Sequence, residues 1–295
     1  MAEQEKMREP FRLRKELRLT PGYLLCIIWA LFTILIIGAT ITASLISTKE
    51  IFGGDILGSF LTRLKNFDLK FDNYTKAWNS QNISRSFTNS LTYSTISLVA
   101  IIVIAAPASY ALSRFKFRFN NVIQNTTSII MGVPAVLIIM PLFGIATSLG
   151  VTNTRPTIIF LYIGMNIPFT VFYLLPFFKN LPSGLEEAAA VDGCGPVKTF
   201  WSIMFPLAQP GLITVSIFNF IGIWNEFFMS MIFANSEGIR PIAVGLYNMI
   251  QGMKYSGDWG GMFASAVIVF APTFVLFIVL SNKILASVTG GAIKG

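Results

Sequence analysis

The sequence predicts an all-α membrane protein that crosses the bilayer six times. Of its 295 residues, 54% are hydrophobic and only 12% are charged, and the mean hydropathy is +0.66. A soluble protein of this length cannot bury so much apolar surface. A membrane helix needs about 20 apolar residues, and six charge-free runs reach that length. These runs are 23–48, 86–113, 119–154, 156–178, 199–225 and 259–282.

The first span is expected near residues 23–47, after a basic segment over residues 1–22. The lysines and arginines of this segment abut the apolar run, so we expect the segment on the membrane surface, against anionic headgroups. Nucleic acid is the alternative partner, but four glutamates interrupt the positive charge. The apolar run is long and lacks a small-residue cleavage site, so we expect it to remain as an anchor.

The other spans are expected near 86–112, 123–147, 156–178, 206–234 and 259–282. The transmembrane domain then covers 23–283, and 284–295 form a cytoplasmic tail. The run from 119 to 154 is expected to hold one span and a polar outer turn, because two spans would need about 40 residues. Prolines favour bends, which either line a cavity or are simple packing kinks. They are Pro107, Pro134, Pro141, Pro168 and Pro272.

Lysine and arginine place both termini in the cytoplasm, because positive charge accumulates on that side of membrane proteins. With this orientation, 13 of the 22 basic residues lie in cytoplasmic segments and three in short outer loops. The other six lie in a long first outer loop, where charge is a weaker signal. This loop carries Phe67, Phe71, Tyr74 and Trp78, and short helices that face a partner are expected in it.

A polar insertion from Ser183 to Pro206 separates two of the apolar runs. Ser183 and Glu186 fit a capping box, which predicts a helix that begins at Gly184. Gly193 is expected to end this helix with a positive φ, and Pro196 suits the first position of a second helix. The insertion is therefore predicted to form a helix, a tight elbow and a helix on the cytoplasmic side.

The elbow resembles the EAA loop of binding-protein-dependent ABC importer permeases. The resemblance rests on Glu187-Ala188-Ala189, on Gly193 and on Ile203 with Phe205-Pro206. Phe205 stands where leucine is usual, and Cys194-Gly195 where small or hydroxyl residues are more common. The alternative is a surface hairpin that merely joins two spans. The likeness extends over nearly the whole chain from about residue 20. The segments 71–74, 89–91, 110–117, 224–228 and 290–295 are similar to the maltose-type carbohydrate subgroup.

This resemblance implies the type I ABC importer permease fold, with six spans in the plasma membrane of a bacterium. The loop 179–205 would dock into cytoplasmic ATPase subunits. The coupling residues carried over are Glu186, Glu187, Ala188, Ala189, Asp192, Gly193 and Gly195. The implied partners are a second, non-identical permease, two ATPases that bind ATP and Mg, an extracytoplasmic solute-binding protein, and a carbohydrate, with oligosaccharide as the expected class.

Polar residues within the spans are a second set of candidates. Glu226 lies beyond a long apolar run, and a carboxylate in lipid costs about 2.5 to 3.5 kcal/mol, so it should face protein or water. It either lines the translocation pathway or bonds helices or subunits together. Asn166, Asn219 and Asn225 are weaker candidates for the same two roles.

Enzyme chemistry is poorly supported. The sequence has no histidine, so histidine-based hydrolase, proton-relay and metal sites have no donor. Lys198-Thr199 is preceded by Val197 rather than glycine and does not form a phosphate-binding loop. We therefore expect no catalytic residue, no metal site and no cofactor bound by this chain. Cys26 and Cys194, in a span and in the elbow, are expected to be free thiols.

Two alternatives to a sugar importer remain. One is an ABC importer permease for a solute other than sugar. The other is a secondary transporter driven by an ion gradient, which would need intramembrane carboxylates and usually internal repeats. Only Glu226 qualifies as such a carboxylate, and no clear repeat is present.

Overall fold

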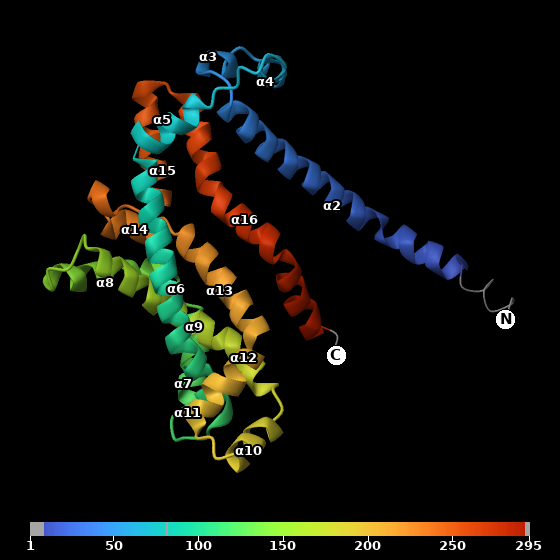
Figure 1. Cartoon of the computed structure of the whole chain (residues 1–295), viewed down its shortest axis with the longest axis vertical. Helices are drawn as coiled ribbons and strands as arrows, with labels where there is room; N and C mark the ends of the chain where they lie inside the picture. The colour runs from blue at the N-terminus through green and yellow to red at the C-terminus, as the bar shows by residue number, and fades with distance from the viewer. Residues whose placement is uncertain (1–8, 81, 293–295) are drawn as a thin grey trace. The chain divides into compact units, whose positions relative to one another are not determined.

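The computed structural model describes residues 9–80 and 82–292, and every regular element within those ranges is helical (Figure 1). The extreme N-terminal residues and 293–295, which belong to the basic segment and the tail expected from the sequence, lie outside the described residues. Contacts divide the chain into two compact units. The smaller contains the residues up to Ala77 together with Met253–Val267, and the larger contains Trp78–Gly252 and the chain from Ile268 onward.

The smaller unit begins with the long helix α2, Glu9–Ser44. Its stretch Leu19–Ser44 has a hydropathy of 2.7, and 0% of its most apolar window is buried. Such a helix suits lipid, because the side chains of that window are apolar and none of them is buried within the described chain. The sequence placed a boundary near residue 22, whereas α2 runs through Pro21 without a break. The proline removes one backbone hydrogen bond but does not end the helix.

Three short helices follow α2, as the aromatic content of the first loop led us to expect: α3, Thr48–Ile51; α4, Ile56–Lys65; and α5, Asp72–Ser80. An ion pair of 2.8 Å joins Glu50 to Arg63, and Arg63 also pairs with Asp68 at 2.5 Å. Burial raises the pKa of Glu50, but hydrogen bonds from Arg63 and Ser47 outweigh it and hold the pKa at about 2. The carboxylate is therefore charged at neutral pH and fixes α3 against α4.

Asn73 ties the end of α2 to the rest of this unit. Its amide donates to the carbonyls of Ser44 and Ile46 over 2.9 and 3.0 Å. A Cβ at Gly260 would come within 2.6 Å of the Asn73 amide nitrogen. Because Gly260 has no side chain, the start of α16, Trp259–Ala292, can pack directly against the Asn73 side chain.

In the larger unit, α6, Ile83–Arg114, packs along α9, Arg155–Lys179, and α13, Gln209–Trp224. Small serine residues recur every three or four positions on the buried side of α6, where they allow helices to approach. They are Ser86, Ser90, Ser94 and Ser97. Gly245 of α15, Ile242–Ser256, fits against this side, because a Cβ there would lie 2.6 Å from the Ser86 hydroxyl.

Two of the expected spans are bent. The third consists of α7, Asn120–Ile130, and α8, Ala135–Ser148, at an angle of 103°. α7 has already ended at Ile130, and Pro134 disfavours helical geometry at Val133, so the chain resumes a helix only at Ala135. Four helices among the described residues are long and apolar enough to cross a membrane, or six if each bent pair is one span.

The fifth expected span, 206–234, is not one helix. The segment Pro196–Leu207 meets α13 at an angle of 76° near Ala208, and α13 ends at Trp224. A separate short helix, α14, Phe228–Phe233, follows the break. The 3-10 turn Glu237–Ile239 then leads toward α15. At the other end of the chain, α16 continues through most of the expected tail, 284–295, as far as Ala292.

Candidate functional site

The elbow has the geometry that its glycines and proline predict. α10, Gly184–Val191, ends with Gly193 at φ 74°. The N–H of Gly193 donates to the Ala190 carbonyl over 3.0 Å, and the N–H of Cys194 donates to the Ala189 carbonyl over 2.8 Å. This pair of bonds is a Schellman motif, which satisfies carbonyls at the end of the helix.

A second helical stretch starts directly after the turn. Gly195 is extended at φ −72° and ψ 163°, and Pro196 takes the first position of α11, Pro196–Thr199. A π-helical turn, Phe200–Met204, and α12, Phe205–Leu207, carry the chain toward α13. Figure 1 shows α10 and α11 at the end of the larger unit where α6 and α9 finish.

The predicted capping box at the start of α10 is wrong. Ser183 has helical dihedral angles, φ −66° and ψ −26°, and its side chain makes no capping hydrogen bond. Glu186 instead faces Arg114, with 3.4 Å between its Oε2 and the arginine Nε. A charged partner at the end of α6 offers a stronger interaction than a backbone N–H that water can satisfy.

Arg114 is a site residue that the sequence reasoning missed. Its side chain is 15% exposed and that of Glu186 is 23% exposed, so the pair is largely shielded from solvent. The guanidinium also donates to the Leu181 carbonyl just before α10. Arg114 therefore contacts both the chain just before α10 and the first turn of α10 itself. The sequence did contain a signal for this pair. Arg114 directly follows the apolar run 86–113, and Glu186 lies in the polar insertion expected on the same side of the membrane.

Apolar contacts hold the inner face of α10. Ala189 is 2% exposed, and Leu185 packs against a buried cluster from α6, α9 and the segment after the elbow. The Tyr110 ring lies 5.7 Å from that of Phe178 and 5.2 Å from that of Phe200. The elbow is therefore packed onto the transmembrane core, and a displacement of α10 must move or break these contacts.

The outer face of α10 is uncovered. Val191 of α10 is 89% exposed, and Val197 of the adjoining α11 is 73% exposed. The exposed residues also include most of the predicted coupling set, namely Glu187, Ala188, Asp192, Gly193 and Gly195. Glu186 and Ala189 face inward instead. An exposed apolar surface with acidic residues beside it, on a well-anchored helix, is typical of a protein docking site.

Glu226 lies in the break between α13 and α14 and caps α14. Its two carboxylate oxygens accept hydrogen bonds from the N–H groups of Met229 at 2.7 Å and Ser230 at 3.0 Å. The Ser230 hydroxyl is 2.6 Å from the carboxylate and 2.6 Å from the Tyr162 hydroxyl of α9. A carboxylate at a helix N-terminus is favoured by the backbone dipoles. These contacts are those of a structural role.

The asparagine candidates lie in two places. Asn219 of α13 is 1% exposed and donates to the Thr170 hydroxyl over 2.8 Å, which in turn donates to the Asn166 carbonyl. This chain of bonds joins α13 to α9. Asn225 is exposed, and its amide donates to the Ile221 carbonyl within its own helix. The structure therefore links Asn166 with Asn219 and leaves Asn225 outside that chain of bonds.

Replacing Glu226 by glutamine tests the cap. The glutamine amide would keep one oxygen acceptor for two backbone donors, so Glu226→Gln is expected to lower the free energy of unfolding by about 1 kcal/mol. It should also lower transport while the complex still assembles, since α14 is held less firmly. Thermal unfolding and uptake would be measured together. Asn225→Ala, at an exposed neighbour, is the control. Unchanged stability and uptake for Glu226→Gln would refute the capping role.

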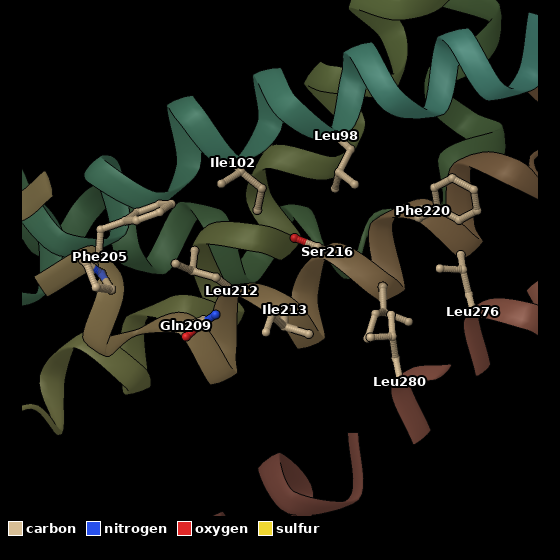
Figure 2. Close-up of a pocket in the computed structure, with 12 residues that line it drawn as sticks. Leu98, Ile102, Phe205, Gln209, Leu212, Ile213, Ser216, Phe220, Leu276 and Leu280 are labelled. Atoms are coloured by element: carbon tan, nitrogen blue, oxygen red, sulfur yellow. The ribbon is translucent and has the colours of Figure 1, made fainter. Parts of the chain in front are cut away.

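An apolar cavity of about 620 Å³ lies beside the bend near Ala208. Figure 2 shows Leu98 and Ile102 of α6 and Leu276 and Leu280 of α16 around the same space as residues of α13. Gln209 and Ser216 are its polar side chains. This lining lacks the hydrogen-bonding groups that a sugar needs, so the cavity fits apolar chains or helices better.

A multi-pass helical membrane chain with an anchored, exposed elbow has the architecture of a membrane transport subunit. The sequence pattern of one family, described as the binding-protein-dependent transport system inner membrane component, matches residues 97–285. The chain belongs to this family. It is thus a multi-pass inner-membrane permease subunit, and such subunits function with a second permease, an ATPase and a binding protein.

Curated relatives cover most of the chain. It is 31% identical to the diacetylchitobiose uptake system permease protein NgcG of Streptomyces coelicolor, over 92% of this chain and 88% of that protein. It is 28% identical to the trehalose transport system permease protein SugB of Mycobacterium tuberculosis, over 90% and 97%. The melibiose/raffinose/stachyose import permease protein MelC of Bacillus subtilis is 28% identical, over 77% and 82%.

A solved structure has the same fold. It is a chain of a bacterial ABC transporter involved in the import of the acidic polysaccharide alginate. The TM-score is 0.76 at 22% identity, and the match covers 90% of this chain and 96% of that one. The ABC importer permease fold expected from the sequence is therefore confirmed.

Proposed function

We propose that this chain is a permease subunit of an ATP-driven importer of carbohydrate, with oligosaccharide as the substrate class. The observation that carries the mechanism is α10, which exposes one face and packs the other onto the transmembrane core. The substrate class is supported by relatives named for diacetylchitobiose, trehalose, and melibiose, raffinose and stachyose. An importer for a different solute is the alternative within the same family.

Coupling between ATP hydrolysis and transport depends on which elbow residues face outward and which pack on the transmembrane core. Glu187, Ala188 and Asp192 on the exposed face contact a cytoplasmic ATPase, while Glu186 and Ala189 fix the helix to the core. Gly193 and Gly195 give the turn its angle. When the ATPases close on ATP and Mg, the docked α10 is displaced and shifts α6 and α9 through their shared contacts. This chain itself binds no cofactor.

The partners of the complex are a second, non-identical permease, two ATPase subunits and an extracytoplasmic binding protein. The exposed apolar surfaces of the spanning helices are available to the second permease and to lipid. A heterodimer lets one permease contact the sugar while the other mainly transmits motion. The secondary-transporter alternative finds little support, because the Glu226 carboxylate is already engaged as a helix cap.

The elbow faces the cytoplasm in this proposal. Cys194 is a free, partly exposed thiol beside Gly193, and it reports on the side directly. We expect a membrane-impermeant maleimide to leave Cys194 unlabelled in intact cells and to label it after permeabilisation. Cys194→Ser gives the background from Cys26. Labelling of Cys194 before permeabilisation would reverse the orientation and remove the docking role of the elbow.

Purification from the native membrane tests the function as a whole. A tagged chain should bring down a second permease and ATPase subunits, and the reconstituted complex should take up an oligosaccharide only with ATP and the binding protein. Uptake of a solute other than a sugar would leave the importer but overturn the substrate class. Transport by the chain alone, driven by an ion gradient, would overturn the proposal.

A further inference from the structure

The helix α4 displays an apolar stripe that the described residues leave uncovered. Leu57, Leu61 and Leu64 are 62%, 53% and 46% exposed. Their spacing of four and three residues places them on one face of the helix. Ile56 and Phe60 lie beside this stripe and are half-buried. Aliphatic side chains in a row on the surface of a short helix mark a contact with something outside the chain.

Phe67 extends this stripe at a cost in conformational energy. It is 96% exposed and has φ 52°. The N–H groups of Phe67 and Asp68 donate to the carbonyls of Leu64 and Arg63 over 3.2 and 2.9 Å. Phe67 thus occupies the Schellman position at which glycine is usual and where a residue with a Cβ is strained. Nothing in the described chain compensates for this, since the ring is almost fully exposed.

The stripe lies next to a membrane span. α2 is apolar over Leu19–Ser44, and α4 contacts α2 within the smaller unit. Figure 1 shows α3 and α4 at the C-terminal end of α2. α4 has 10 residues, about half the number that a spanning helix needs. It can therefore lie at the membrane surface but cannot cross the bilayer.

Charge at the end of α4 suits the same location. Lys65 in the last turn is exposed beside Leu64, and a lysine at the interface can reach a lipid phosphate while its methylenes stay among the acyl chains. Arg63 turns the other way, where it pairs with Glu50 and Asp68. The helix is thereby attached to the loop on one side and apolar on the other, which is typical of interfacial helices.

We propose that α4 and Phe67 lie in the membrane interface at the C-terminal end of α2, with the leucine stripe among lipid acyl chains. The occupant of the stripe is lipid rather than a protein because α4 contacts α2, whose unburied apolar window is long enough to span a bilayer, and because the stripe is aliphatic apart from Phe67. The insertion anchors the first loop. It also holds the Glu50–Arg63–Asp68 ion pairs and Asn73 at a fixed height above the bilayer.

Fluorescence quenching tests this placement. Leu61→Cys and Thr62→Cys, each in full-length chain with Cys26→Ser and Cys194→Ser, would be labelled with a small fluorophore. Thr62 is exposed on a different side of α4 and is the matched control. The proteins would be placed in phosphatidylcholine and phosphatidylglycerol nanodiscs, with brominated acyl chains or with aqueous iodide as quencher. Leu57→Cys provides a second stripe position if Leu61→Cys fails to fold.

We expect bromolipid to quench the stripe probe several-fold more strongly than the Thr62 probe, and iodide to give the reverse order. Equal iodide quenching at both positions would overturn the proposal. So would a Leu61 probe that bromolipid never reaches and that becomes protected only when a second permease or the binding protein is added, because that result assigns the stripe to a protein partner.

Discussion

Gly193→Val is expected to abolish transport while the chain still inserts into the membrane. Gly193 has φ 74°, which a β-branched residue adopts only with strain of about 1–3 kcal/mol. A Cβ at this position would meet nothing within 4 Å, so the effect arises from the backbone and not from crowding. Valine should open the Schellman turn and displace α10, whereas the span sequences that govern insertion are unchanged.

The measurement is binding-protein-stimulated ATP hydrolysis and uptake in proteoliposomes with matched amounts of wild type and variant. Gly193→Asn is the informative control, because asparagine tolerates a positive φ better than other side chains. It should retain a substantial part of transport. Wild-type uptake and stimulation in Gly193→Val would mean that the angle of the elbow does not matter for coupling.

Glu186→Gln should have the second largest effect. Arg114 would lose the carboxylate at 3.4 Å while its side chain remains only 15% exposed. A mostly buried guanidinium without its charged partner is expected to lower the free energy of unfolding by about 2 kcal/mol. Because Arg114 and Glu186 join α6 to α10, ATP hydrolysis should continue but produce less uptake per ATP consumed.

A control at the next residue separates the loss of the Arg114–Glu186 pair from the mere loss of a negative charge on α10. Glu187→Gln removes the same charge from an exposed position of the same helix, so it should leave thermal stability unchanged. A cycle with Arg114→Gln measures the pair directly, and the double variant should lose less than the sum of the single variants. Additive losses would show that the two residues do not interact.

Local patterns predicted the parts of the structure that depend on neighbouring residues. The six apolar runs follow from composition, and the elbow follows from Gly193 and Pro196, whose backbone preferences act at their own positions. Free thiols at Cys26 and Cys194 are also observed. The bends were harder to predict, because a proline in a membrane span either lies at a break in the helix, as Pro134 does, or is accommodated, as Pro107 is within α6.

Side-chain contacts between residues that are distant in the sequence could not be predicted from the sequence. The pattern Ser183 to Glu186 predicted a capping box, yet Glu186 pairs with Arg114, 72 positions earlier in the chain. Glu226 was singled out as an ionisable residue beyond a long apolar run, but the break after Trp224 that gives it a helix to cap was not predicted. Each outcome depends on packing that brings separate segments together, and the spacing along one segment does not contain that information.

Cross-linking from Val191 tests the central claim most directly. Val191 is 89% exposed at the end of α10. A Val191→Cys variant with Cys26→Ser and Cys194→Ser would be treated with a short thiol-reactive cross-linker in the assembled complex. Leu57→Cys, 62% exposed on α4, is the control. We predict a covalent adduct between this chain and an ATPase subunit from position 191 and none from position 57. The absence of that adduct in a complex that hydrolyses ATP and transports would contradict docking through α10.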